Sequence, residues 1–510
     1  MLTWIDNFLN KITMYRLVFY YLCVLLVAAF VLCLVGILPY DPAALAFSFA
    51  VILGVSWTAN RLLAWAFDAA ANVESVYITA FILALIIPPV AATDPAGVGF
   101  LIFASVWAMA SKFLLAPGKR HIFNPAAFGV ALSALVIGHS ATWWVGGNLP
   151  LLPFVLIGGL LIVRKVQRFD LVLAFTAAAA VSILGLGGSG TALTSIQETL
   201  LHSSFFFFAF VMLTEPLTTP PTRSLRIAYG AIVGLLFGPN VHFGNFYLSP
   251  ELALLVGNVF SWAVSPKGRY MLTLVGTEEV AKDAYEFSFA PDRPFSFAPG
   301  QYMEWTLSHK YADDRGNRRY FTVASSPTER DVRLGVKFYA PASTFKRALA
   351  AMKPGDRISA AHISGGFTLP RNPDKKLVFI AGGIGITPFR SMVRYLVDRG
   401  EHRDVVILYS NRTKDDIAYR ALLDDAAARI GIRTVYAVTA DAPGAAPETD
   451  PNVYHGPIDA SFIARAIPDF KDRTFYISGP HAMVDAFGRT LRGMGVSRLR
   501  IKSDFFPGFA

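Results

Sequence analysis

Charged residues are scarce in this chain, and their scarcity excludes a single soluble globule. Only 16% of the 510 residues are charged and 54% are hydrophobic, whereas a soluble domain has about 25% charged residues. The acidic and basic residues crowd into the second half of the sequence. This asymmetry predicts a membrane part followed by a soluble part. The net charge of +10 does not indicate nucleic-acid binding, because much of it lies in short loops between apolar runs.

Cysteine is nearly absent. The two cysteines, Cys23 and Cys33, both lie in the first apolar run, and two thiols cannot build a disulfide framework or a four-cysteine iron–sulfur site. Haem would need histidines on facing helices as axial ligands. The histidines of the first half lie at the ends of apolar runs or in loops: His121, His139, His202 and His242. We therefore expect neither haem nor another metal site.

Long apolar runs fill the first half. About 20 apolar residues are enough for a helix to cross a bilayer, and several of these runs are shorter and end at Pro or Gly, which is typical of tilted, broken or re-entrant segments. No small-residue cleavage site follows the first run, so we expect a retained first span. The sequence predicts an all-α bundle of about ten transmembrane helices, at residues 15–38, 44–67, 75–90, 97–116, 124–142, 149–164, 169–187, 203–216, 226–239 and 250–265.

The loops between these runs predict an orientation. If the loops alternate between two sides of a membrane, one side receives all of their lysines and arginines and the other side receives none. The positive-inside rule then puts both termini and the soluble half in the cytoplasm of a bacterial-type inner or plasma membrane. The basic loops contain Lys11, Arg16, Arg61, Lys119, Arg120, Arg164, Lys165, Arg168, Arg223, Arg226, Lys267 and Arg269.

Ionisable residues inside spans would mark an ion pathway. Those that fall in or beside the apolar runs are Arg61, Asp68, Glu74 and Glu215, all near the expected cytoplasmic ends. No acidic relay crosses the predicted bilayer, so the sequence does not support ion pumping by this chain alone.

Two membrane segments are rich in polar residues. Gly118–Ala127 places a basic cluster with Lys119 before a span that opens with Asn124-Pro, a good helix start. Thr214–Thr222 follows a phenylalanine-rich run. One interpretation is helix punctuation with topology charges. The other is a polar pocket for a flavin or its phosphate, formed by Lys119, Asn124, Thr214, Glu215 and Thr218.

These segments, read as HIFNPAA and FVMLTEPLTTPPT…IAYGAIVG, resemble the NqrB/RnfD family over most of residues 40–265. The resemblance implies a ten-span flavoprotein of a respiratory electron-transfer complex. Family members carry FMN esterified to a threonine in a Ser-Gly-Ala-Thr-like motif. Here the nearest text, Gly188–Thr194, departs from that motif. An additional FMN or riboflavin in the membrane domain is therefore expected to be non-covalent.

The soluble half has two patterns. Short β-rich runs with Gly/Pro turns up to about Leu369 predict a small β-barrel, and strand–helix alternation after Lys375 predicts a parallel α/β sheet. The expected domains are a transmembrane domain at 1–266, a barrel at 267–371 and an α/β domain at 372–510.

A motif in each soluble domain supports a second resemblance. Arg319-Tyr320-Phe321-Thr322 matches the Arg-x-(Tyr/Phe)-(Ser/Thr) flavin motif of the ferredoxin–NADP reductase superfamily, which the chain resembles over about 268–510. The resemblance implies that Arg319 pairs with the FAD phosphate, a task that suits a guanidinium fork. It further implies that Phe321 lies against the isoalloxazine and that Thr322 bonds flavin N5.

The same resemblance assigns further FAD ligands. Val336-Lys337, followed by Ser343-Thr344, resembles the segment that binds the pyrophosphate and adenosine of FAD. The alternative for these four residues is an ordinary strand and helix cap.

The second motif, Ala381–Pro388, is the superfamily's strand–turn–helix signature. Its glycines let a pyrophosphate approach the backbone, and the helix N-terminus adds N–H donors. Thr387 is expected near the nicotinamide. The motif residues with a predicted nucleotide role are Gly382, Gly383, Gly385, Thr387 and Pro388.

Three further segments complete the predicted nucleotide site. Ser478-Gly479-Pro480 takes the place of a family Cys-Gly-Pro segment beside the hydride-transfer site, and Phe506 resembles the tail aromatic that shields the flavin. Arg412 offers a group for the adenine ribose or a 2′-phosphate, but the nearby Asp415-Asp416 disfavours a phosphate, so NADH is slightly favoured over NADPH.

Together these features predict an NAD(P)H-dependent flavin oxidoreductase, with Thr322, Thr387 and Ser478 at the reaction site. Electrons would pass from cytoplasmic NAD(P)H through FAD and a membrane flavin to an extracytoplasmic redox protein or a quinone. One alternative is a membrane-anchored NAD(P)H:quinone or ferric reductase that uses only FAD. Another, from a different class, is a flavin-regulated transporter.

Overall fold

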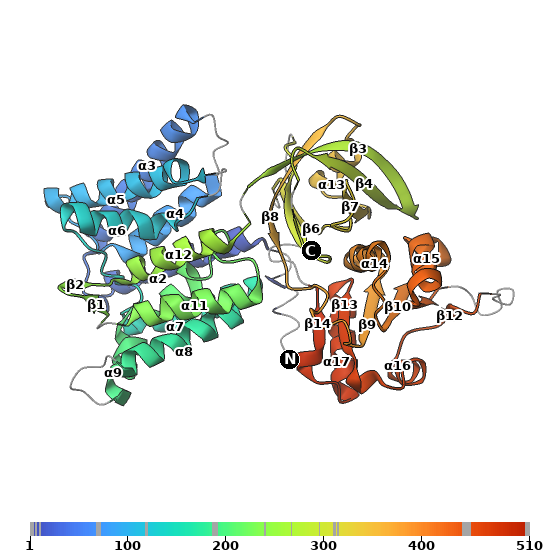
Figure 1. The fold of residues 1–510 in the computed structure, drawn as a ribbon. Coiled ribbons are helices and arrows are strands. Elements are labelled where there is room, and N and C mark those ends of the chain that lie inside the picture. Colours follow the sequence, from blue (N-terminus) through green and yellow to red (C-terminus); the bar gives the residue numbers. More distant parts are fainter. Residues whose placement is uncertain are drawn as a thin grey trace. The chain divides into compact units, whose positions relative to one another are not determined.

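The computed structural model describes residues 5, 8–9, 12–67, 73–117, 121–185, 192–238, 241–266, 268–294, 296–309, 313, 316–440 and 450–504. The chain divides into two compact units, one that contains Met1–Gly268 and one that contains Arg269–Phe506. The first unit is helical, and the second is built on β-sheets (Figure 1).

Helices make up nearly all of the first unit, and each predicted apolar run contains one. The described helices are α2 (Met14–Leu34), α3 (Pro42–Ala66), α4 (Val73–Ile86), α5 (Pro95–Leu114), α6 (Pro125–Ile137), η2 (Leu149–Leu151), α7 (Leu152–Val166), α8 (Phe169–Gly185), α9 (Ala192–His202), α10 (Phe205–Phe207), η3 (Phe208–Met212), α11 (Arg223–Phe237) and α12 (Pro250–Val264). A two-strand ribbon, β1 (His242–Phe243) and β2 (Phe246–Tyr247), precedes α12.

The expected count of about ten membrane spans is not confirmed. Within the described residues, four helices are long and apolar enough to cross a bilayer: Met14–Leu34, Pro42–Ala66, Pro95–Leu114 and Leu149–Val166. Others are apolar but shorter, at Glu74–Ile86, Pro125–Ile137, Phe169–Gly185 and Pro250–Val264. The difference arises because hydropathy does not detect where the backbone leaves the helix.

The end of α4 illustrates such a break. The helix stops at Ile86, before Pro88, and its last carbonyls are satisfied by another segment. The Ile86 carbonyl accepts from the Thr142 and Trp143 N–H groups at 3.1 and 2.9 Å. The Trp144 indole donates to the Ala84 carbonyl at 3.1 Å. A helix can end inside an apolar bundle only when protein groups take over its free carbonyls in this way.

Local sequence sets where several helices begin. Asp41, Asp94 and Asn124 each precede a proline, and each side chain accepts a hydrogen bond from an N–H of the first helical turn. Proline at the first position loses no hydrogen bond there. The Asn124-Pro125 start predicted from the sequence is therefore a true N-cap.

Helices α8 and α11 pack with their backbones close together. A Cβ at Gly230 would lie 2.7 Å from the Leu171 carbonyl oxygen, and one at Gly234 would lie 2.4 Å from the Phe175 carbonyl oxygen. Small residues four apart allow this approach, which contributes much of the packing energy between helices in an apolar medium.

The second unit begins with an antiparallel sheet that curls (Figure 1). Among the described residues its strand order is β6-β5-β8-β3-β4-β7. The strands are β3 (Tyr270–Ala281), β4 (Ala284–Pro291), β5 (Tyr302–Thr306), β6 (Arg318–Thr322), β7 (Val332–Lys337) and β8 (Arg357–Ser364), and α13 (Thr344–Ala350) follows β7. Trp305, Phe289 and Phe345 are fully buried in its core.

A parallel sheet follows, with described strand order β12-β11-β10-β9-β13-β14. Its central strand β9 (Leu377–Gly382) is buried on both faces, with Phe379 packed on one side and Ile380 on the other. Helices α14 (Thr387–Arg399) and α15 (Arg420–Ile430) cover the Phe379 face, and α16 (Ala460–Ala466) and α17 (His481–Gly493) cover the other (Figure 1). The remaining strands are β10 (Val405–Asn411), β11 (Arg433–Val438), β12 (Val453–His455), β13 (Thr474–Ser478) and β14 (Ile501–Ser503).

We predict that Gly234→Ala lowers the thermal stability of the detergent-solubilised protein, because its Cβ would meet the backbone of α8. A loss of about 1–3 kcal/mol is typical of overpacking. Gly54→Ala in α3 is the matched control, since a Cβ there meets nothing within 4 Å. Thermal unfolding of both variants checks this, and equal midpoints would contradict the close contact of α8 and α11.

Candidate functional site

The predicted flavin motif forms strand β6, at one end of the antiparallel sheet. Arg319 and Phe321 are two residues apart and both lie against Phe345 of α13. The Arg319 guanidinium carbon is 5.2 Å from the centre of the Phe345 ring, and the Phe321 and Phe345 ring centres are 5.9 Å apart. Tyr320 and Thr322 alternate with these two residues along the strand. The Tyr320 hydroxyl donates to Glu304 at 2.9 Å, and Thr322 is 5% exposed.

Arg319 forms an ion pair with a carboxylate of the same chain. It is 8% exposed, and its guanidinium donates to the Gly316 carbonyl at 3.0 Å and to the Asp313 carboxylate at 3.2 Å. The other Asp313 carboxylate oxygen accepts from the Thr344 backbone N–H at 3.1 Å. A guanidinium and a backbone N–H therefore converge on one carboxylate. The same donors suit a phosphate oxygen.

Asp313 was not among the residues predicted from the sequence. Its partner Thr344 was predicted, together with Ser343, and Ser343 is the N-cap of α13 through a bond from the Lys346 N–H at 3.3 Å. Asp313 lies 31 residues before Thr344, and no local pattern signals a contact over that distance.

The glycine-rich nucleotide motif joins β9 to α14, with η4 (Gly383–Ile386) between them. A Cβ at Gly385 would lie 2.6 Å from the Ser478 carbonyl oxygen and from the Gly479 Cα. One at Gly382 would lie 3.3 Å from Pro480 and closer still to the Met483 side chain. The two predicted segments, 382–388 and 478–480, are thus brought together at the carboxyl ends of neighbouring strands, where α/β sheets bind ligands.

The antiparallel sheet touches this motif directly. A Cβ at Gly335 in β7 would lie 2.6 Å from the Thr387 methyl group and 2.7 Å from the Tyr419 hydroxyl. Two residues on, the Lys337 ammonium is 2.5 Å from the Asp416 carboxylate, in the turn after β10. Val336 points into the sheet's core and is 2% exposed. The role of Val336 and Lys337 in binding FAD stays a prediction.

The remaining predicted residues of the nucleotide site differ in their exposure to solvent. The Ser478 hydroxyl donates to Asp504 at 3.1 Å and is 3% exposed. Thr387 opens α14 and is 7% exposed, with Pro388 after it. Arg412 follows β10 and is exposed. Phe506 lies outside the described residues.

Four of the predicted membrane-site residues lie near the end of η3, and two of them, Asn124 and Thr218, bond to a third, Glu215. The Asn124 amide donates to Glu215 at 2.9 Å, and the Thr218 hydroxyl donates to the same carboxylate oxygen at 3.1 Å. The Thr214 hydroxyl donates to the Phe210 carbonyl at 2.7 Å. His121 is 3.8 Å from the second Glu215 oxygen. Lys119 lies outside the described residues.

A cavity of about 70 Å³ adjoins this cluster. Its lining is mostly apolar, from α2, α4, α7 and η3, with Asn124, Thr214 and Glu215 at its polar side together with Ser75 and Thr79. Sequence reasoning missed Lys112 of α5, whose ammonium donates at 3.0 Å to the Ser75 hydroxyl and to the Thr79 hydroxyl. A lysine in the last turn of an apolar helix has the pattern of a topology charge, so no local signal could have revealed this contact.

Comparison with known families separates the two halves. Residues 146–266 match the NQR2, RnfD, RnfE family. Residues 379–488 match the oxidoreductase NAD-binding domain. Each half matches a different family. These matches confirm the two family resemblances inferred from the sequence.

Individual relatives align with only part of this chain. The chain is 28% identical over 256 residues to an NADPH oxidoreductase of Mycobacterium tuberculosis, which covers 49% of this chain and 62% of the relative. It is 32% identical over 192 residues to NADH-cytochrome b5 reductase 2 of Gallus gallus, which covers 32% of this chain and 62% of the relative. A glycine betaine monooxygenase reductase subunit of Pseudomonas aeruginosa is 28% identical over 262 residues. This alignment covers 48% of this chain and 66% of the relative. The chain thus spans less than two thirds of the length of these relatives.

Among solved structures, the flavohem-like FAD/NAD binding domain of nitric oxide dioxygenase from Vibrio cholerae O1 biovar El Tor is similar to this chain. The TM-score is 0.41 at 19% identity, and the alignment covers 46% of this chain and 98% of that domain.

The Lys337–Asp416 pair should make the stability of the turn after β10 depend on pH. Burial raises the pKa of Asp416, but hydrogen bonds from Lys337 and Thr413 outweigh it, so this pKa lies below its usual range. Because the pKa of Asp416 is lower in the folded protein than its unfolded value of about 3.9, the ionised carboxylate stabilises the folded turn at any pH above that unfolded value. That stabilisation is lost only as the pH falls through the lowered value.

We therefore expect Lys337→Met to raise the pKa of Asp416, so that the turn at 411–418 loses protection at a higher pH than in the wild type. Hydrogen exchange of peptides covering 411–418, measured from about pH 7 to about pH 4 and corrected for intrinsic rates, checks this. Lys376→Met, which removes the Lys376–Asp469 pair elsewhere in the second unit, is the control. It should leave the hydrogen-exchange protection of 411–418 unchanged. The same pH profile in Lys337→Met and wild type would contradict the prediction.

Proposed function

We propose that this chain is an NAD(P)H-dependent flavin oxidoreductase that passes electrons from cytoplasmic NAD(P)H, through FAD, into its own membrane half. The observation that carries the proposal is the direct contact between α14, which follows the nucleotide motif, and the segment that follows the flavin motif. The Ser391 hydroxyl of α14 donates to the Ser325 carbonyl at 2.6 Å. Ser391 follows Thr387 by one helical turn, and Ser325 follows Thr322 by three residues.

The donor set around Asp313 fits a flavin phosphate. The Arg319 guanidinium and the Thr344 N–H supply charge-assisted donors, and Ser343 holds the start of α13 in place. Phe321 offers an aromatic face, and the Thr322 hydroxyl would hold a proton near flavin N5. A bound flavin supplies the conversion between two-electron uptake and one-electron release. Val336 and Lys337 remain proposed contacts of the same cofactor.

The nucleotide would lie at the carboxyl ends of β9 and β13. Gly382, Gly383 and Gly385 permit close approach of its pyrophosphate, and Thr387-Pro388 begins the helix that faces it. Ser478, Gly479 and Pro480 would flank the nicotinamide, and Arg412 the adenine ribose. The carboxylates of Asp415 and Asp416 oppose a 2′-phosphate, which supports NADH over NADPH.

The membrane half would carry the electrons onward. A hydrocarbon core of about 30 Å is thick for a single electron hop, so we propose a non-covalent FMN or riboflavin beside Asn124, Thr214, Glu215 and Thr218, with Lys119 near its phosphate. Both termini and the reductase half would be cytoplasmic, with domain limits at 1–266, 267–371 and 372–510. The acceptor would be an extracytoplasmic redox protein or a quinone.

One observation favours a second candidate. The Glu215 carboxylate already accepts bonds from Asn124 and Thr218, and the adjoining cavity is only about 70 Å³. A cluster with its bonds satisfied also fits a structural role. The membrane half would then be an anchor for an NAD(P)H:quinone or ferric reductase that uses FAD alone.

Cofactor analysis of the purified chain decides between the two candidates. We expect at least two flavins per chain, all reduced by NADH under anaerobic conditions. Glu215→Gln should lower the flavin content by about one per chain and leave the FAD of the soluble half in place. One flavin per chain in the wild type would contradict the transmembrane route and support the anchor. No reduction by NADH or NADPH would contradict both.

A second prediction concerns Asp313. Its carboxylate uses the donors that a flavin phosphate needs, so Asp313→Asn should strengthen FAD binding to the cofactor-stripped protein by about tenfold, which corresponds to about 1.4 kcal/mol. Flavin fluorescence quenching measures this. Asp374→Asn, at an exposed carboxylate, is the control. Weaker binding in Asp313→Asn would mean that Asp313 orders Arg319 for the cofactor and does not compete with it.

A further inference from the structure

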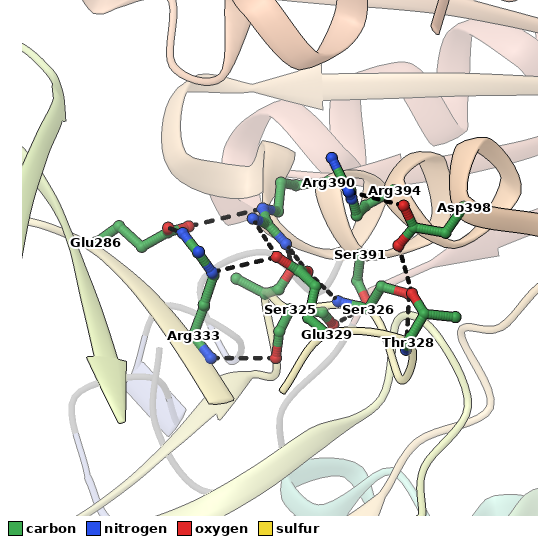
Figure 2. Close-up of polar contacts among 11 residues, drawn as sticks. Glu286, Ser325, Ser326, Thr328, Glu329, Arg333, Arg390, Ser391, Arg394 and Asp398 are labelled. Atoms are coloured by element: carbon green, nitrogen blue, oxygen red, sulfur yellow. Dashed lines mark hydrogen bonds and ion pairs between the residues drawn. The ribbon is translucent and has the colours of Figure 1, made fainter. Parts of the chain in front are cut away.

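A network of charged side chains joins α14 to the antiparallel sheet (Figure 2). Its centre is Arg390, which is 6% exposed. The Arg390 guanidinium forms two hydrogen bonds with Glu329, one of them at 3.0 Å, and its Nε lies 3.6 Å from Glu286. It also donates to the Ala324 carbonyl at 3.2 Å.

The two carboxylates come from the flavin-motif side of the unit. Glu286 lies in β4 and is 2% exposed, and Glu329 lies in the turn that follows the flavin motif. Arg333 of β7 forms ion pairs with both, with 3.2 Å between its Nε and Glu329. Two arginines thus balance two carboxylates in a largely dehydrated contact, where loss of one partner leaves a buried charge.

The same face of α14 makes further bonds to residues 324–329. Ser391 donates to the Ser325 carbonyl at 2.6 Å, and Asp398 accepts from the Thr328 hydroxyl at 2.5 Å (Figure 2). Glu329 also accepts from the Ser326 N–H at 2.7 Å, which holds the turn in shape. The segment that leaves the flavin motif is therefore fastened to the helix that leaves the nucleotide motif.

The contacts between α14 and residues 324–329 lie close in sequence to Thr322 and Thr387. Ala324 follows Thr322 by two residues, and Arg390 follows Thr387 by three. Each threonine is therefore tied closely to the contact, because Ala324 lies two residues beyond the end of β6 and Arg390 lies in the first turn of α14 after Thr387. The Arg390 contacts thus set the separation between the flavin side and the nicotinamide side of the site.

We propose that Arg390 is a positioning residue for hydride transfer in this protein. This inference rests on the proposed NAD(P)H-dependent function. The step breaks the C4–H bond of the dihydronicotinamide and forms the N5–H bond of the flavin, so one hydrogen nucleus and two electrons leave the nucleotide, which becomes the oxidised nicotinamide. Reacting atoms must approach to about 3–3.5 Å, and an error of about 1 Å costs about 100-fold in rate. Arg390 acts on that distance without touching either ring.

The chain offers a matched control in Arg473. It is 7% exposed, and its guanidinium is bonded to Asp404 at 2.6 Å and to Asp469 at 2.7 Å. Arg473 therefore resembles Arg390 in burial and in having two carboxylate partners, but these partners belong to the parallel-sheet lobe. Removing either arginine should destabilise the fold, whereas only the loss of Arg390 should change hydride transfer.

Anaerobic stopped-flow reduction of the flavin-loaded full-length chain tests the proposal, with NADH and with NADH deuterated at the transferred position. Arg390→Met should slow reduction at saturating NADH by about 100-fold, while the Kd for NADH and the flavin content change by less than about threefold. Arg390→Lys keeps the charge but loses the paired hydrogen bonds, and should recover part of the rate. Arg473→Met should keep the wild-type rate at a lower thermal midpoint.

Different results would overturn the positioning role of Arg390 and the proposed NAD(P)H-dependent function. Equal slowing in Arg390→Met and Arg473→Met, or an unchanged rate in Arg390→Met, would overturn the positioning role. If Arg390→Met does not fold, an unchanged reduction rate and isotope effect in Arg390→Lys would overturn it instead. A wild-type chain that holds flavin but is not reduced by NADH or NADPH would overturn the proposed function, and with it this role for Arg390.

Discussion

The contact between α14 and residues 324–329 is the constraint on which the second unit depends. The antiparallel sheet and the parallel sheet each have their own core. Each sheet could therefore hold its own motif in shape while the two motifs stayed apart. Arg390 and Ser391 remove that freedom by bonding to the segment that follows the flavin motif. The ion pairs are placed where water is largely excluded, which makes their geometry strict and a missing partner costly.

The membrane half follows a different constraint, the need to satisfy every backbone group without water. Helices too short to cross a bilayer are stable here because other segments cap their ends, as the chain at Thr142–Trp143 does for α4. The same need explains why polar residues gather at breaks. The Asn124–Glu215 bond joins the start of α6 to the segment after η3, and it adjoins the cavity for which we propose a ligand.

Local pattern was enough to predict several parts of the structure. The β-rich region that contains Arg319–Thr322, the glycine-rich turn before α14 and the Asn124 cap depend on residues close together in the chain, and the structure has each of them where it was expected. Asp313, Lys112 and the Glu286–Arg390 pair were not predicted, because their contacts join residues far apart in the sequence. The expected number of spans is not confirmed, since an apolar run has the same hydropathy whether its helix continues or breaks.

The Asp313–Arg319 pair has a consequence for how the protein folds. With an internal counter-ion, the Arg319 guanidinium is not a lone buried charge before a cofactor arrives. The antiparallel sheet can therefore fold without an anion from outside the chain to neutralise this arginine, since a buried charge is most costly when it is unpaired.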